Sequence, residues 1–105
     1  MSNNKIMNYI LKKINNNEGK NIKILNVKNK SNITNFIIIC TGISNKHIMN
    51  IANNIIKKIN LIGIKTKYIT IENSIDWIVI DLNNIIIHIM LKETRKLYNI
   101  EQLWI

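Results

Sequence analysis

Apolar residues recur along the chain at two spacings, and each spacing predicts one type of element. Three isoleucines four residues apart predict an amphipathic helix over about residues 4–16: Ile6, Ile10 and Ile14. A longer apolar stripe at helical spacing predicts a second helix: Ile48, Ile51, Ala52, Ile55, Ile56, Ile59 and Ile62. Ser44 suits the N-cap of this helix and Gly63 suits its C-terminal stop.

Alternating or uninterrupted apolar runs predict strands. They cover residues 22–27, 36–41, 65–71, 77–82 and 85–90, and residues 91–105 are expected to form mostly short helix. The wholly apolar run FIIIC opens the strand at 36–41, which is typical of a strand covered on both faces. Asn83 and Asn84 suit a two-residue hairpin turn, because Asn tolerates positive φ.

The order of these elements favours an α/β fold. A strand, a helix and a strand around residues 36–71 indicate one crossover, which gives a mixed five-stranded sheet with helices packed on it. The length of 105 residues suits a single domain over 1–105.

The hairpin turn sets which side chains share a face of the sheet. One face is aliphatic and is expected to be core: Ile78, Ile80 and Leu82 opposite Ile89, Ile87 and Ile85. The other face carries Trp77, Val79 and Asp81 beside Met90, His88 and Ile86. Asp81 and His88 are then diagonal neighbours that could share a hydrogen bond. Trp77 is either covered as core or presented to a partner, and spacing alone leaves both open.

Three kinds of chemistry find little support in the sequence. An Asp81–His88 pair lacks a nucleophile and an oxyanion site, since the nearby hydroxyls Thr41 and Ser44 stand in a helix-cap context. Cys40, His47 and His88 lack metal-ligand spacing, and the stretch TGISNKH lacks the glycines of a phosphate-binding loop. We therefore expect no catalytic residue, no metal ligand and no cofactor.

Composition changes how the charge is interpreted. Ile, Asn and Lys fill 62 of 105 positions, and their codons are A/T-rich, so the net charge of +9 partly reflects base composition. The charge is nevertheless uneven, with +11 over residues 1–70 and −2 over residues 71–105. The front half could attract nucleic acid and the back half a basic protein.

Cysteine usage and segment hydropathy indicate where the protein acts. Cys40 is the only cysteine and lies in an apolar run, which predicts an inert buried thiol in a reducing compartment. No apolar run approaches the roughly 18–20 residues of a membrane span, and the N-terminus lacks a signal-peptide core. We expect a cytoplasmic protein with no membrane partner.

A general RNA-binding module is the main alternative from the residues themselves. The six aromatic residues are scattered and form no aromatic-plus-basic strand motif: Tyr9, Phe36, Tyr68, Trp77, Tyr98 and Trp104. Trp77 rimmed by Asp76 and Asp81 instead has the composition of a protein-interface hot spot.

Several motifs in order resemble the ribosomal silencing factor family, the bacterial Iojap-related proteins. They are KSNITNFIIICTGISNKHIMNIANNI, ENSIDWIVIDL, IIIHIM and TRKLYNIEQLW, and the resemblance runs from about Asn8 to Trp104. The sequence departs from the family pattern at Lys46, where Arg is usual, and at Asn35, where Asp is common.

The resemblance implies a translation repressor that is not an enzyme. Family members bind the large ribosomal subunit through a basic ribosomal protein on the subunit-joining face, the fourteenth large-subunit protein, and block docking of the small subunit. The implied topology is nucleotidyltransferase-like without the catalytic residues, so a degenerate nucleotidyltransferase is a further alternative. Whether the free protein forms a homodimer and whether it contacts ribosomal RNA are left open.

Carried over residue by residue, the family's docking surface falls on the Trp77 face and the C-terminal segment. Trp77 and Tyr98 are the expected anchors, and Leu82 is a further candidate although the register places it on the core side. The expected acidic complements to the basic partner are Asp76, Asp81 and Glu93.

Overall fold

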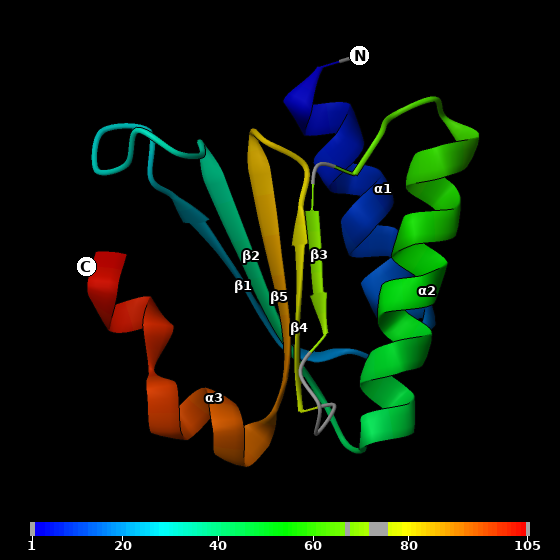
Figure 1. Cartoon of the computed structure of the whole chain (residues 1–105), viewed down its shortest axis with the longest axis vertical. Helices are drawn as coiled ribbons and strands as arrows, with labels where there is room; N and C mark the ends of the chain where they lie inside the picture. The colour runs from blue at the N-terminus through cyan, green and yellow to red at the C-terminus, as the bar shows by residue number, and fades with distance from the viewer. Residues whose placement is uncertain (1, 67, 72–75, 105) are drawn as a thin grey trace.

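One face of a β-sheet is covered by two long helices in the computed structural model of the protein (Figure 1). The helices are α1 (Asn3–Asn16) and α2 (Asn45–Leu61). The strands are β1 (Lys20–Asn26), β2 (Phe36–Gly42), β3 (Tyr68–Ile71), β4 (Trp77–Asp81) and β5 (Ile85–Leu91). The short α3 (Lys92–Tyr98) and a 3₁₀-helix, η1 (Ile100–Trp104), lie on the other face. The structure describes residues 2–66, 68–71 and 76–104.

The sheet is mixed and has the strand order β1-β2-β5-β4-β3. β2 and β5 pair in parallel, and the other neighbours are antiparallel. The predicted mixed α/β sheet with packed helices is thus confirmed. The strand expected at 65–71 is reduced to the four residues of β3, and Lys67 and residues 72–75 lie outside the described residues.

Two hydrophobic clusters fill the two sides of the sheet. The cluster under α1 and α2 is the larger, and its fully buried members include Ile14, Ile38, Ile51, Ile55, Ile78, Ile80 and Ile87. The second cluster lies under the C-terminal segment and consists of Val27, Ile37, Ile39 and Met90. β2 contributes to both, which explains its uninterrupted apolar run and confirms the prediction of a strand covered on both faces.

The ends of α2 form as predicted. The Ser44 hydroxyl accepts a hydrogen bond from the His47 amide at 3.0 Å, and Gly63 has φ of 81° just beyond the helix. His47 bonds locally, since its Nδ1 accepts from the Ile43 amide at 2.9 Å. Its Nε2 then donates to the Asn17 carbonyl at 2.6 Å, which ties the start of α2 to the end of α1.

The hairpin of β4 and β5 has the predicted register. Ile80 pairs with Ile87 and Ile78 with Ile89, while Trp77 pairs with Met90 on the other face. Asn83 adopts φ of 76°, the left-handed conformation that the turn requires.

The hydrogen bond considered between Asp81 and His88 does not form. Asp81 Oδ1 accepts from the Asn83 amide at 2.7 Å, and His88 Nδ1 accepts from the indole of Trp77 at 3.1 Å. Each group is engaged by a different partner, so the hydrogen-bonded pair considered from the sequence is absent.

Two further predictions concern Cys40 and membrane spans. Cys40 is fully buried, and burial raises the pKa of its thiol to about 12, so the thiol is kept protonated and unreactive. Among the residues described, none of the helices combines the length and apolar character needed to cross a bilayer.

Candidate docking surface

Three rings on the second face of the sheet form an aromatic cluster: Trp77, His88 and Tyr98. The Trp77 and Tyr98 ring centroids are 4.9 Å apart with planes tilted by 47°, and those of Trp77 and His88 are 5.9 Å apart. β4 supplies Trp77, β5 supplies His88 and α3 supplies Tyr98. The distances are in the range of favourable tilted aromatic pairs. The hairpin and α3 therefore build one joint surface.

Trp77 belongs both to the core and to the surface. It is half-buried and packs against the second hydrophobic cluster, as do Ile100 and Trp104 of η1. Its partner Tyr98 keeps 58% of its side chain exposed. Trp77 is thus partly covered as core, and its presentation to a partner stays a prediction.

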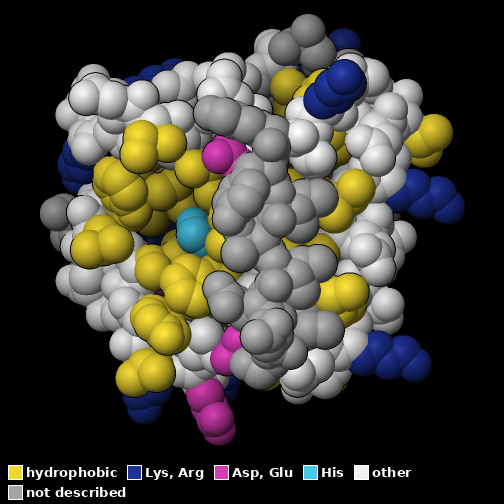
Figure 2. All heavy atoms as spheres, viewed as in Figure 1, with side chains coloured by type: hydrophobic (Ala, Val, Ile, Leu, Met, Phe, Trp, Pro, Cys, Tyr) yellow, Lys and Arg dark blue, Asp and Glu magenta, His cyan; other side chains and the backbone are white. Residues whose placement is uncertain are grey.

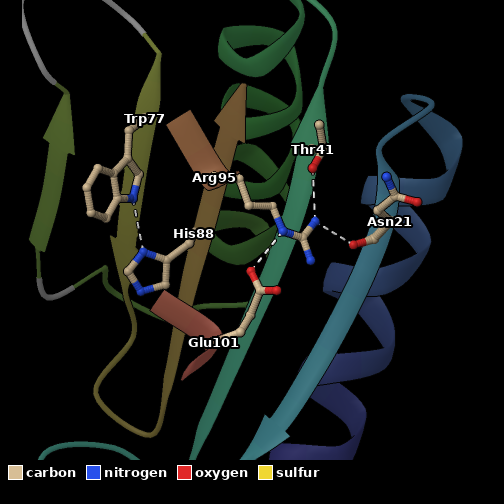
Figure 3. A network of polar contacts seen from close by, with 6 residues as sticks. All are labelled: Asn21, Thr41, Trp77, His88, Arg95 and Glu101. Atoms are coloured by element: carbon tan, nitrogen blue, oxygen red, sulfur yellow. Dashed lines mark hydrogen bonds and ion pairs between the residues drawn. The ribbon is translucent and has the colours of Figure 1, made fainter. Parts of the chain in front are cut away.

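His88 forms the polar centre of the cluster. Its Nδ1 accepts the Trp77 Nε1–H (Figure 3). In the neutral imidazole the ring proton is then on Nε2. Burial lowers the pKa of His88 to about 4, which keeps the imidazole neutral at physiological pH. The bond fixes the orientation of the indole that the surface presents.

Apolar side chains surround the cluster. Figure 2 shows them gathered around a His on this face, with acidic side chains at the margins. On the C-terminal segment, Leu97 is 78% exposed and Leu103 is 74% exposed. Exposed apolar side chains on the segment that carries Tyr98, together with partly exposed aromatic rings, are the arrangement expected of a protein-binding surface.

The predicted acidic residues divide into two groups. Asp76 precedes Trp77 directly and accepts a hydrogen bond from the Thr94 hydroxyl at 3.1 Å, so it also secures α3. Glu93 is exposed in the first turn of α3 and lines the same cavity of about 570 Å³ as Asp76. Asp76 therefore lies beside the aromatic cluster, whereas Glu93 lines a cavity that none of the three rings lines. The predicted docking role of both carboxylates stays a prediction.

Asp81 and Leu82 lie away from the cluster. Asp81 is four residues beyond Trp77 on β4, about 13 Å along a strand, and its carboxylate caps the hairpin turn. Leu82 packs against the larger cluster on the α1–α2 side, so it does not share the face of Trp77. The reason is the strand alternation, which places even-numbered β4 residues on the helix side.

Sequence analysis missed the residue that holds the C-terminal segment in place, Arg95. Its Nε donates to Glu101 at 3.0 Å, and its Nη1 donates to the Asn21 carbonyl at 2.6 Å and to the Thr41 hydroxyl at 2.9 Å (Figure 3). The side chain is only 13% exposed. A separation of 74 residues between Asn21 and Arg95 leaves no periodic signal in the sequence.

The described residues offer no grouping of three His, Cys, Asp or Glu side chains suited to a metal ion. What the second face presents instead is a set of aromatic and apolar groups with carboxylates at one margin. This arrangement is suited to binding a protein with a basic surface.

Comparisons with known proteins agree with the family resemblance. Residues 1–105 match the model of the family described as "Ribosomal silencing factor during starvation". The chain is 34% identical over 99 residues to ribosomal silencing factor RsfS of Haemophilus influenzae, covering 94% of this chain and 97% of that protein. It is 28% identical over 88 residues to mouse "Mitochondrial assembly of ribosomal large subunit protein 1", covering 81% of this chain and 39% of that protein.

A solved structure shows the same fold. A crystal structure of a protein from Chromobacterium violaceum superposes with a TM-score of 0.95 at 26% identity, and the match covers 99% of this chain and 87% of that one.

Proposed function

Because this chain belongs to the family of ribosomal silencing factors, we propose that it represses translation by binding the large ribosomal subunit and blocking the small subunit sterically. The proposed contact is the basic ribosomal protein on the subunit-joining face that the family resemblance implies. The observation that carries the proposal is the aromatic cluster of Trp77, His88 and Tyr98, which is partly exposed and has Asp76 beside it.

We further propose that the protein acts without catalysis. In support, the carboxylate of Asp81 caps a turn and the Nδ1 of His88 is engaged by Trp77. Both groups serve the shape of the surface rather than proton transfer. The nucleotidyltransferase-like topology stays a prediction from the family resemblance, and so does the absence of enzymatic activity.

The test is co-sedimentation with purified large ribosomal subunits. We expect Tyr98→Ala and Trp77→Ala each to weaken retention by about 30-fold, which corresponds to roughly 2 kcal/mol for a central aromatic anchor. Tyr9→Ala is the matched control, because Tyr9 lies on α1 on the opposite side of the sheet. Wild-type protein should also slow the joining of small subunits to large ones.

Retention of Trp77→Ala and Tyr98→Ala at the wild-type level would show that the docking surface is elsewhere. Circular dichroism and thermal unfolding of each variant separate lost binding from lost folding. This matters most for Trp77, which also packs against the second hydrophobic cluster.

A further inference from the structure

A basic groove runs along the side of α3 that faces away from Trp77. It is a cavity of about 370 Å³ whose charged lining residues are Lys92, Arg95, Lys96 and Glu101. Glu101 is already engaged by Arg95 at 3.0 Å, whereas Lys92 and Lys96 are exposed. Asn21, Thr41 and Asn99 add polar groups to its walls. The groove therefore has an excess of positive charge and many hydrogen-bonding groups.

The neighbouring cavity of about 570 Å³ is electrostatically different. Its charged lining residues are the cations Lys20 and Lys92 and the carboxylates Asp76 and Glu93, so positive and negative charges balance. The two cavities share Asn21, Thr41 and Lys92, so the surface passes from a balanced cavity into the basic groove.

Helical geometry separates the basic groove from the aromatic contacts. Lys92 and Lys96 are four residues apart and lie on one side of α3, with Arg95 beside them. Thr94 and Tyr98, also four residues apart, lie on the opposite side, where they contact Asp76 and Trp77. An α-helix is about 10–12 Å across with its side chains, so the basic groove lies within that distance of the aromatic cluster.

We propose that the basic groove binds backbone phosphates of ribosomal RNA beside the ribosomal protein that the aromatic cluster contacts. This inference rests on the proposed function. A ribosomal protein on the subunit surface is bordered by RNA, so a ligand that docks on it meets a boundary between basic protein and phosphate. Asp76 beside the aromatic cluster and the basic groove on the other side of α3 are complementary to such a boundary and would fix the orientation of docking. Lysine and arginine neutralise phosphates and release counterions, which makes the contact dependent on salt.

The test is the salt dependence of binding to purified large subunits. We compare wild-type protein with Lys92→Ala/Lys96→Ala between about 0.05 and 0.3 M KCl, because the slope of log affinity against log salt counts the phosphate contacts. Loss of two phosphate contacts should reduce the slope of log affinity against log salt by about 1.4 to 1.8. At 0.1 M KCl the affinity should fall by about tenfold or more.

The control removes the same charge from the other side of the molecule. Lys12 and Lys57 are exposed on α1 and α2, so Lys12→Ala/Lys57→Ala should keep the wild-type slope. Equal slopes for both double variants, whether changed or unchanged, would overturn the proposal.

A second measurement distinguishes RNA from protein as the occupant. Binding to the isolated interface-side ribosomal protein, purified free of RNA, should be unaffected by Lys92→Ala/Lys96→Ala. An equal loss on that RNA-free partner would mean that the lysines contact protein, and the proposal would be wrong. Tyr98→Ala should weaken binding both to large subunits and to the isolated ribosomal protein. If that variant binds both like the wild type, the proposed function fails, independently of the result for the two lysines.

Discussion

At the residue scale, His88 shows how surroundings change the role of a titratable group. Read as a sequence, a histidine and an aspartate on one strand face suggest acid–base chemistry. In the structure the ring is neutral, its pKa is lowered to about 4 by burial, and it accepts a hydrogen bond from Trp77. His88 therefore orients an indole.

This environment predicts a specific dependence of stability on pH. Above pH 6.5, the ordinary pKa of histidine, the group is neutral in both the folded and the unfolded chain, and its contribution to stability is complete. As the pH falls from 6.5 towards 4, the unfolded chain binds a proton that the folded protein excludes, so the free energy of unfolding decreases. The decrease cannot exceed about 1.4 kcal/mol per pH unit for one proton.

Urea unfolding at pH 7.5, 6 and 5 measures the effect. His88→Gln should flatten the profile, because the amide oxygen can still accept the Trp77 N–H but does not titrate. His47→Gln serves as the comparison, since it removes the other histidine of the chain. A profile for His88→Gln as steep as that of the wild type would contradict the assignment.

At the element scale, the end of α3 decides where the C-terminal segment goes. Asn99 adopts φ of 44° and ψ of 51°, and its amide bonds to the Arg95 carbonyl at 2.9 Å. This left-handed residue ends the helix and redirects the chain into η1, which packs Ile100 and Trp104 over the second hydrophobic cluster.

The left-handed conformation predicts different outcomes for two small substitutions. Asn99→Ala should lower the free energy of unfolding by about 1 kcal/mol, because a Cβ without a polar side chain disfavours this conformation. Asn99→Gly should be close to neutral or stabilising. Chemical denaturation of the two variants checks the prediction, and equal stabilities would argue against the αL assignment.

At the scale of the whole molecule, the sheet lies between two layers that are attached to it by different contacts, α1 with α2 on one face and α3 with η1 on the other. The α1–α2 layer covers its face with a large aliphatic cluster, whereas the C-terminal layer is short and relies on polar contacts as well. Arg95 supplies several of these contacts at once, joining α3 to η1 and to the first two strands. A second tie is Lys30, whose ammonium donates to the Trp104 carbonyl at 2.7 Å.

Removing the Arg95 charge should therefore loosen the C-terminal layer. Arg95→Met is expected to cost about 2–4 kcal/mol, because it leaves Glu101 and the Asn21 carbonyl without their largely buried partner. It should also weaken binding to large subunits, since α3 carries Tyr98.

A double-mutant cycle with Glu101→Gln isolates the ion pair. We expect the double variant to lose less free energy of unfolding than the two single variants lose together. Additive losses would show that Arg95 acts through Asn21 and Thr41 alone.

The sequence by itself determined the order and type of most elements, the register of the hairpin and the family. These features depend on local periodicity, on turn residues such as Asn83 and on motifs that are contiguous in the chain. The pairing of Trp77 with Met90 follows from counting across a two-residue turn.

Only the tertiary structure decided which residues form the surface. Tyr98 meets Trp77 at 4.9 Å, and Arg95 meets Asn21 across 74 positions, because α3 folds back over the sheet at a point that no periodicity encodes. The same packing separated Asp81 and Leu82 from the cluster and left Trp77 half-covered. Contacts between distant segments depend on how the layers stack to bury their apolar faces, which is a property of the whole chain.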